Sequence, residues 1–425
     1  MGVRTSRRLA RVLTAPFGSF IAGCETRAAD PALVAKQVLI VLLLTAAGAV
    51  GAAIAWWGPR EPLRQAVALG RRFPRLAATG LGMGLTLLPL VALEGVLRAV
   101  VALREQDRTI YSIPAFEEHP DLGYRPKAAV TTTATRYAPD GEVVYEVVYT
   151  MDREGRRAVP RSSSAAPRRA VAFFGCSFTF GEGLRDEETL PARYAERATS
   201  DLAINFGVPG YGPNHMLAIL RSWTTNPLPD LPSPPLGVYL FIDGHIGRAI
   251  GSVYVVNRYG RRAPYFRLED DELVVRRGSY LSGRFFTSIT FWALGKSVIL
   301  RELGFDWPRP GSSRSLRITA GIVRAASSEF AARTGGGRFY MVVYPGSRWG
   351  AEVARQAGVT VLDYTELFDP LESDYVIEGD GHPSAYAIPQ LAGRLAQDLA
   401  TSVSGSDSEP GAGMGPGAAA HPGDR

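Results

Sequence analysis

The chain has 425 residues, which is long enough for two average domains or for one large domain with additional segments. Apolar residues make up 46% and charged residues 21%, an ordinary globular composition that excludes a wholly disordered or fibrous protein. The formal net charge is +6, and all but three of the 47 basic residues are arginines. These arginines are spread along the chain rather than gathered in one stripe, so we expect no nucleic-acid partner.

The cysteines and histidines form neither a disulfide framework nor a metal-binding pattern. Cys24 and Cys176 are too few for a framework, and no CxxC pair is present. The five histidines are scattered along the chain, without an HExxH motif or a zinc-finger spacing. We therefore predict no metal site and no cofactor.

Residues 1–36 are basic and irregular. Within them, residues 21–24 (Ile-Ala-Gly-Cys) match the short motif that precedes a lipid-modified cysteine in bacterial lipoproteins. The preceding stretch contains Pro16 and Gly18 and is a poor apolar core for a signal peptide. A chance match is therefore the favoured interpretation.

Two apolar runs follow the basic segment. Residues 37–57 carry no charge and end in two tryptophans, which is typical of a helix that crosses about 30 Å of hydrocarbon. Residues 76–97 form a second run that contains Pro89 and Glu94, and we expect Glu94 to pair with Arg98 one turn later. Together they predict a hairpin of two transmembrane helices, as in an integral protein of a bacterial inner membrane. The arginine pattern does not decide on which face of the membrane the rest of the chain lies.

The rest of the chain reads as a soluble α/β protein. Residues 105–165 are predicted to form a small β-rich appendage, with a turn at Asp140–Gly141. Residues 168–400 contain short apolar runs separated by helical stretches, the pattern of a parallel sheet buried on both faces. The runs are 170–174, 202–206, 238–242, 338–344 and 359–362. Residues 252–282 look like a β-rich insertion that could cap the site, and 402–425 like a disordered tail.

Ser177 is the candidate nucleophile. It follows the first apolar run of the α/β region directly, where a parallel sheet usually binds its ligand. A serine is a weak nucleophile until a base takes its proton, so a histidine is required elsewhere in the chain.

His382 is the best candidate for that base. It stands in Gly379-Asp380-Gly381-His382-Pro383, just before a predicted helix over 385–399. Asp380 lies two residues away and could orient the imidazole, which completes the roles of a Ser-His-Asp triad. The alternative is a plain helix-entry turn in which Ser384 caps the helix.

Three segments also carry a family resemblance. Residues 175–183 read GCSFTFGEG, residues 205–212 read NFGVPGYG, and residues 380–384 read DGHPS. In this order and spacing, over residues 168–400, they resemble the motif blocks of the SGNH, or GDSL-type, hydrolase superfamily. The resemblance implies a flavodoxin-like three-layer αβα domain that cleaves ester or acyl bonds on lipids, glycans or small esters. Membrane-anchored relatives include proteins that transfer O-acetyl groups to polysaccharides.

The resemblance assigns roles to individual residues. Ser177 would be the nucleophile, His382 the general base and Asp380 its orienting acid. The backbone N–H groups of Ser177 and Gly210 would stabilise the oxyanion.

The chain departs from the family pattern at three places. Cys176 replaces the usual aspartate before the serine, and one residue instead of two separates Asp380 from His382. The third block, Phe-Ile-Asp-Gly-His-Ile over 241–246, lacks the asparagine that donates to the oxyanion. Gly244 or His245 stands at its position, and we expect the His245 imidazole to replace it, with Asn214 as a further candidate.

Three functions remain open at this level. The first is a membrane-anchored esterase or deacylase that acts on an ester-bearing small molecule, glycan or lipid. The second is acyl transfer to an envelope or secreted polysaccharide, which implies partners in polysaccharide biosynthesis. The third is a catalytically silent binding module, which the missing asparagine and the shortened last block would explain.

Overall fold

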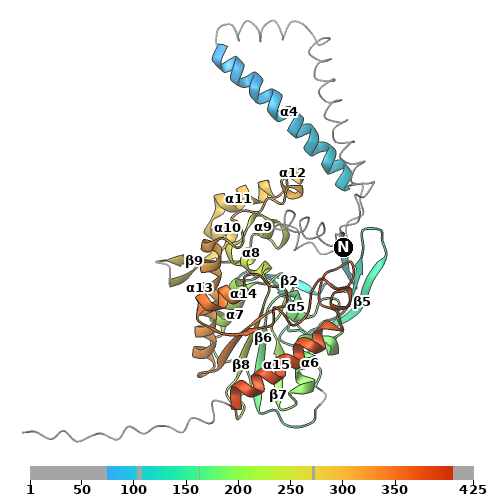
Figure 1. Cartoon of the computed structure of the whole chain (residues 1–425), viewed down its shortest axis with the longest axis vertical. Coiled ribbons are helices and arrows are strands. Elements are labelled where there is room, and N and C mark those ends of the chain that lie inside the picture. The colour runs from blue at the N-terminus through green and yellow to red at the C-terminus, as the bar shows by residue number, and fades with distance from the viewer. Residues whose placement is uncertain (1–73, 103–107, 162, 270–272, 405–425) are drawn as a thin grey trace, which may run out of the picture.

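The computed structural model describes residues 74–102, 108–161, 163–269 and 273–404 (Figure 1). Its centre is a five-stranded sheet in which all neighbouring strands are parallel. The strands are β6 (Arg169–Phe174), β7 (Asp201–Asn205), β8 (Leu236–Phe241), β11 (Arg338–Val343) and β12 (Thr360–Asp363). They match the five predicted apolar runs closely, which confirms the prediction of a parallel α/β sheet.

The strand order across the sheet is β12-β11-β8-β6-β7. If the five strands are numbered 1 to 5 in chain order, their order across the sheet, read from the β7 edge, is 2-1-3-4-5. This is the strand order of flavodoxin-like sheets. The direction of strand addition therefore reverses between β6 and β8. In sheets of this kind, ligands bind outside the carboxyl ends of the strands at that reversal.

Helices cover both faces of the sheet because both faces are apolar. In β6, Ala170, Ala172 and Phe174 belong to one core, and Val171 and Phe173 to the other. The first core is covered by α7 (Pro213–Ser222), α8 (Gly244–Ile250), α13 (Ser313–Arg333) and α14 (Gly350–Ala357). The second is covered by α6 (Leu190–Arg197) and α15 (Ala387–Ser404), so the domain has three layers.

The β-rich region before the sheet contains five short strands. These are β1 (Arg108–Tyr111), β2 (Phe116–His119), β3 (Gly123–Pro126), β4 (Thr131–Tyr137) and β5 (Val143–Thr150). Strands β1, β4 and β5 form an antiparallel sheet, while β2 and β3 form a hairpin. Gly141 has a φ of +88° in the turn between β4 and β5, where the sequence predicts it. Tyr149 of β5 shares a core with Phe180, so this region packs directly on the α/β domain.

The segment after α8 is only partly the β-rich insertion that the sequence predicts. The hydroxyl of Ser252 accepts the N–H of Val255 and starts a helix, α9 (Val253–Arg258). Strands β9 (Pro264–Glu269) and β10 (Leu273–Ser279) then form a hairpin that packs against α7 and α13. Three further helices follow: α10 (Tyr280–Gly283), α11 (Phe285–Leu294) and α12 (Val298–Glu302).

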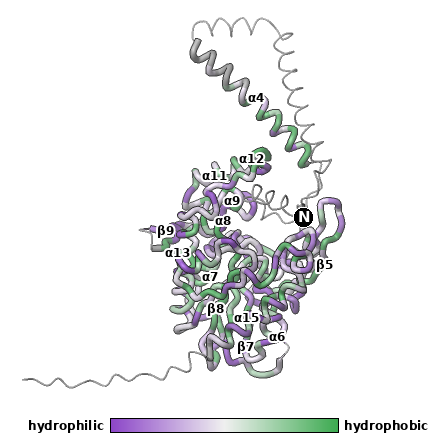
Figure 2. The backbone as a smooth tube through the Cα atoms, in the orientation of Figure 1, coloured by the Kyte–Doolittle hydropathy of each residue, from purple (hydrophilic) through white to green (hydrophobic). Residues whose placement is uncertain are grey.

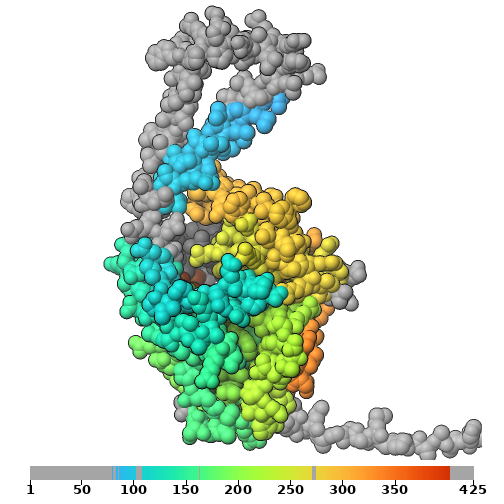
Figure 3. Space-filling model, turned by 180° about the vertical axis from the view of Figure 1, so that it is seen from behind, coloured from blue at the N-terminus to red at the C-terminus, as the bar shows by residue number. Residues whose placement is uncertain are grey.

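The second predicted membrane span lies within a single helix, α4 (Pro74–Ala102), which projects from the body of the molecule (Figures 1 and 3). Glu94 pairs with Arg98 at 2.8 Å, as the sequence predicts, and its other oxygen accepts the hydroxyl of Ser297 at 2.9 Å. Among the described residues, none of the helices has both the length and the apolar character that a membrane crossing needs. The prediction of a spanning helix over 76–97 is therefore not supported.

Other predictions fall on parts of the chain that are not described. The first apolar run, 37–57, and the basic segment 1–36 with Cys24 lie outside the described residues. Of the predicted disordered tail, residues 402–404 are the last residues of α15, and 405–425 lie outside the described part.

Candidate active site

Ser177 stands at the carboxyl end of β6, beside the reversal of strand order. It begins the one-turn helix α5 (Ser177–Phe180), and Gly175 makes the connection from β6. Gly175 has a φ of +156°, and a Cβ there would lie 2.1 Å from Thr179 Oγ1, so only glycine fits this turn. The structure therefore holds Ser177 at the carboxyl edge of the sheet, where parallel sheets usually bind their ligands.

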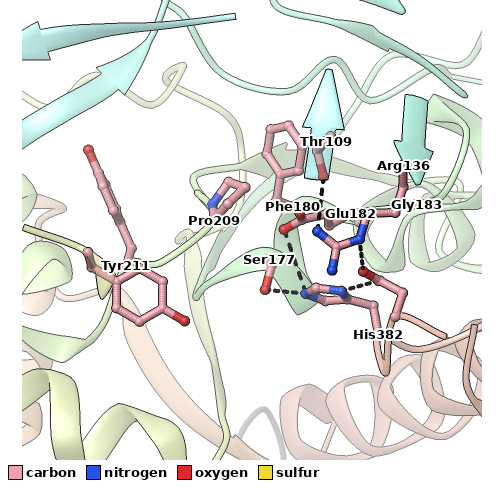
Figure 4. Close-up of polar contacts among 12 residues, drawn as sticks. Thr109, Arg136, Ser177, Phe180, Glu182, Gly183, Pro209, Tyr211 and His382 are labelled. Carbon is pink, nitrogen blue, oxygen red and sulfur yellow. Dashed lines mark hydrogen bonds and ion pairs between the residues drawn. The ribbon is translucent and has the colours of Figure 1, made fainter. Parts of the chain in front are cut away.

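His382 and Asp380 lie in the loop before α15, distant from Ser177 in the sequence, and the His382 ring contacts the serine (Figure 4). The Nε2 atom of His382 lies 2.8 Å from Ser177 Oγ, and its Nδ1 is hydrogen-bonded to Asp380 Oδ2. The turn that carries them is closed by the N–H of Ile377, which donates to the carbonyl of His382 at 2.8 Å. The shorter spacing between Asp380 and His382 thus still allows the carboxylate to reach the ring.

The β-rich region supplies a residue to this site that the sequence analysis missed. Arg136 of β4 places its Nε 3.3 Å from Asp380 Oδ1, and its guanidinium also donates to Thr109 Oγ1 at 3.3 Å (Figure 4). The side chains of Arg136 and Asp380 are 12% and 3% exposed. No motif surrounds Arg136 in the sequence, so only the packing of the β-rich region on the α/β domain identifies it.

A second carboxylate lies on the side of the histidine that faces the serine. Glu182 Oε2 is 3.6 Å from His382 Nε2, and its side chain is 16% exposed (Figure 4). Glu182 belongs to the GCSFTFGEG segment, but the sequence analysis gave it no role. The imidazole is therefore flanked by a carboxylate at each nitrogen.

These charges determine the protonation of the site. Burial disfavours a charged imidazole, but Glu182 and Asp380 outweigh it and raise the pKa of His382 to about 9. Burial also disfavours the charge on Asp380, but the hydrogen bond from His382 and the charges of His382 and Arg136 lower the pKa of this carboxyl. In the resting protein at neutral pH, a carboxylate thus faces a largely protonated ring.

A buried arginine fixes the turn that follows the nucleophile. The Arg157 side chain is 0% exposed and donates to the carbonyls of Phe180, Gly181 and Leu184, the latter two at 2.8 and 2.7 Å. Its Nε also pairs with Asp186 at 2.8 Å. Since three carbonyls of this turn depend on one guanidinium, Arg157 holds the segment that carries Glu182.

The loop of the second motif block packs against the same turn. Asn205 donates to the carbonyl of Thr179 at 3.0 Å, and the N–H of Val208 donates to Gly175 at 3.3 Å. Gly210 has a φ of +81°, and a Cβ there would lie 2.3 Å from the hydroxyl of Tyr124. Within the described ranges, the N–H of Gly210 has no hydrogen-bond acceptor. It is thus an available backbone donor on the loop beside Ser177.

The prediction that His245 donates to the oxyanion is wrong. His245 is the second residue of α8, and this helix turns the imidazole into the core, where it is 0% exposed. Its Nδ1 lies 2.8 Å from the hydroxyl of Tyr239, and its ring stacks on Tyr239 and contacts Phe241 edge-on. A substrate oxygen has no access to this ring. Burial also holds its pKa well below the ordinary value, so the ring is neutral.

The other two candidates for the missing donor do not replace it either. Asn214 is 0% exposed, and its amide donates to the carbonyl of Pro264 in β9 at 2.9 Å. It ties α7 to the hairpin rather than facing the site. Gly244 begins α8 and has no side chain that could supply an amide.

The site offers no set of metal ligands. Across the described residues, there is no group of three or more histidine, cysteine, aspartate or glutamate side chains that could hold a metal ion. Asp380 instead binds His382 through one carboxylate oxygen and Arg136 through the other.

A serine, a histidine and an aspartate joined by hydrogen bonds at the edge of a parallel sheet are the arrangement of serine-dependent hydrolases and acyltransferases. No family model matches the sequence, and the comparison with curated proteins finds no match. Solved structures that are similar to this chain are lipolytic proteins and carbohydrate esterases.

Three of these structures illustrate the similarity. A lipolytic protein of the G-D-S-L family from Veillonella parvula is 12% identical, with 55% of this chain and 98% of that chain covered and a TM-score of 0.31. A family two carbohydrate esterase from Clostridium thermocellum, solved with cellohexaose, is 13% identical, with coverages of 59% and 68% and a TM-score of 0.32. An acetyl xylan esterase from Butyrivibrio proteoclasticus is 10% identical, with coverages of 59% and 67% and a TM-score of 0.30. All three TM-scores lie below 0.5, so the residues of the site, and not these similarities, indicate the function.

Proposed function

We propose that the protein is an SGNH-type serine esterase that acts through an acyl-enzyme. The observation that carries this proposal is the chain of contacts from Ser177 Oγ to His382 Nε2, at 2.8 Å, and from His382 Nδ1 to Asp380. This geometry allows one imidazole to take the serine proton while the aspartate holds its orientation. It also argues against the silent binding module, because no binding function requires this alignment.

The reaction follows from the roles of these groups. Neutral His382 takes the proton of Ser177 as Oγ attacks the ester carbonyl, and the N–H groups of Ser177 and Gly210 stabilise the oxyanion. The imidazolium then gives its proton to the departing alcohol, which leaves the acyl group on Ser177. Water attacks this acyl-enzyme, again losing its proton to His382, and the carboxylic acid departs as Ser177 regains its proton.

Covalent labelling tests the proposal most directly. A fluorophosphonate probe is expected to label the wild-type protein but not Ser177→Ala. The control is Ser328→Ala, which removes an exposed serine of α13 and is expected to be labelled like the wild type. Turnover of a p-nitrophenyl ester by Ser177→Ala is expected to fall by about 10⁶ in kcat. Normal turnover by a folded Ser177→Ala protein would contradict the assignment, and failure to label the wild type would favour the binding module.

The substrate class that we propose is an ester on a glycan or a lipid, in accordance with the motif resemblance. We also propose that the apolar run 37–57 anchors the protein in a membrane. The full chain is then expected to stay in the membrane fraction through high-salt and alkaline washing, because apolar burial does not depend on ionic strength. Release by either wash would contradict the anchor.

A second candidate function is acyl transfer to a hydroxyl group, and Glu182 is the observation that favours it. For hydrolysis alone, a carboxylate 3.6 Å from Nε2 is a disadvantage, because it favours the protonated ring that cannot take the proton of Ser177. A carboxylate at this place can accept a hydrogen bond from a second hydroxyl of a sugar whose first hydroxyl attacks the acyl-enzyme. Glu182 would then favour a polyol over water as the acceptor.

The partition of the acyl group tests this candidate. In Glu182→Gln, hydrolysis of a simple ester at pH 7 is expected to increase, because the pKa of His382 falls. Transfer of a labelled acyl group to an oligosaccharide is expected to decrease by about tenfold, or about 1.4 kcal/mol, because the neutral amide oxygen accepts a weaker hydrogen bond than the carboxylate. The exposed Glu187→Gln is the matched control. If the rates of hydrolysis and of acyl transfer both increase in Glu182→Gln, Glu182 does not bind the acceptor. The esterase proposal would not be affected by that result.

A further inference from the structure

Large apolar side chains are exposed on α11 and on the segment that follows α12. Six of them lie between residues 285 and 307 and are 40% to 84% exposed. They are Phe285, Phe286, Trp292, Leu303, Phe305 and Trp307. We refer to these six residues as the aromatic surface. Soluble surfaces rarely gather so much apolar area within one short segment unless it contacts a partner.

The aromatic surface adjoins the helix that projects from the molecule. Glu94 of α4 accepts the N–H groups of Val298 and Ile299 at 2.8 and 3.1 Å, which places it at the first turn of α12. Arg98 donates to the carbonyl of Lys296 at 2.8 Å. Figure 1 shows the lower end of α4 beside α12, and Figure 2 shows apolar residues along α12 and the near part of α4.

The exposed side of α4 is apolar as well. Among the α4 side chains that the structure describes, the large apolar ones that are exposed are Met83, Leu87, Leu88, Leu90 and Val91. Helix α4 and the aromatic surface therefore present apolar groups at the same end of the molecule, and the polar contacts of Glu94 and Arg98 join the two.

Basic groups surround the tryptophan of α11. The guanidinium of Arg261 lies 5.2 Å from the centre of the Trp292 ring, and the ammonium of Lys296 lies 5.7 Å from it. Arg301 of α12 is also exposed, and its guanidinium lies 3.4 Å from the exposed carboxylate of Glu302. Aromatic rings beside lysine and arginine are characteristic of the boundary between headgroups and hydrocarbon, where the rings enter the apolar layer and the cations face phosphates.

We propose that the aromatic surface contacts a lipid bilayer with anionic headgroups. Phe286 and Leu303, the two most exposed of its residues, enter the boundary of the hydrocarbon, while Lys296 and Arg301 face lipid phosphates. The contact does not require a spanning helix, and it does not depend on the reaction at Ser177. It holds the α/β domain against the membrane at the end from which α4 leaves.

Site-specific photo-crosslinking in the full chain tests the contact. The photoreactive residue p-benzoylphenylalanine replaces Phe286 in one variant. In the control it replaces Thr225, which is exposed in the loop before β8, at the amino edge of the sheet. Both proteins are reconstituted in vesicles of phosphatidylcholine and phosphatidylglycerol with a radiolabelled lipid, and both are first checked for an unchanged melting temperature.

Irradiation is expected to attach labelled lipid at position 286 at least tenfold more than at position 225. Crosslinking of position 286 to protein, either residues 1–73 of the same chain or a second copy, would overturn the proposal, because another partner would then cover the surface. Equal lipid labelling at both positions would also overturn it. As a second measurement, brominated lipids are expected to quench less tryptophan fluorescence in Trp292→Phe than in Trp349→Phe, since Trp349 packs against the sheet core.

Discussion

The Nε atom of Arg136 lies 3.3 Å from Oδ1 of Asp380, and the other oxygen of that carboxylate binds His382. A strand of the β-rich region thus contacts the aspartate that orients the proposed base. The pair is nearly buried, so its attraction is screened less than that of a surface ion pair. This contact makes the β-rich region part of the candidate active site rather than a separate appendage.

Removing Arg136 is expected to weaken catalysis and stability together. In Arg136→Gln, Asp380 loses its second partner and holds the imidazole less firmly, so kcat is expected to fall by about tenfold, or about 1.4 kcal/mol, with little change in KM. The free energy of unfolding is expected to fall by about 3 kcal/mol, because a buried charge loses its partner. The control is Arg125→Gln, which removes an exposed pair with Glu117 and is expected to change stability by less than about 1 kcal/mol. A normal kcat in Arg136→Gln would show that Asp380 is positioned without it.

The pH dependence of activity follows from the pKa of His382. The neutral ring is the active form, so kcat/KM for a simple ester is expected to rise with pH and to level off above about pH 9. In Glu182→Gln the rising limb is expected to move to lower pH, because the negative charge that favours the imidazolium is removed. Glu187→Gln is expected to leave the limb in place. The measurement is the pH profile of initial rates, and an unmoved limb in Glu182→Gln would mean that Glu182 does not act on the ring.

Arg157 is expected to contribute mainly to stability. Its guanidinium satisfies three carbonyls and Asp186 in a fully buried position, so Arg157→Ala leaves several buried polar groups without a partner. The free energy of unfolding in urea is expected to fall by about 3–5 kcal/mol. Arg153→Ala, which removes a nearby exposed arginine, is expected to change it by less than about 0.5 kcal/mol. Similar unfolding curves for the two variants would show that water replaces the bonds of Arg157 without cost.

His245 is expected to matter for folding and not for the chemical step. In His245→Ala, the buried hydroxyl of Tyr239 loses its partner and a cavity forms, so stability is expected to fall by about 2–4 kcal/mol. The kcat of the folded variant is expected to stay near that of the wild type. A loss of 10²–10³ in kcat, the usual effect of removing an oxyanion donor, would restore the original hypothesis for this residue.

The sequence alone predicts the central sheet and the residues that meet at its edge. Strands that are buried on both faces must be apolar throughout, so β6, β7, β8, β11 and β12 are visible as short apolar runs. The turns at Gly175 and Gly381 have positive φ angles, which explains why glycines mark the two motifs around Ser177 and His382. The apolar runs and the glycine turns each depend on residues that are adjacent in the chain, so they can be predicted from the sequence.

Contacts between distant segments were decided by the tertiary structure. Arg136 reaches Asp380 only because the β-rich region folds over the carboxyl edge of the sheet, and no periodicity or motif in the sequence encodes that approach. His245 was assigned to the site from its place after β8, but the first turn of α8 directs its ring into the core beside Tyr239. The direction in which a side chain such as that of His245 points depends on the backbone angles of one turn and on the space between the neighbouring helices. The sequence therefore determined which residues could do chemistry, and the packing of separate elements determined which of them face one another.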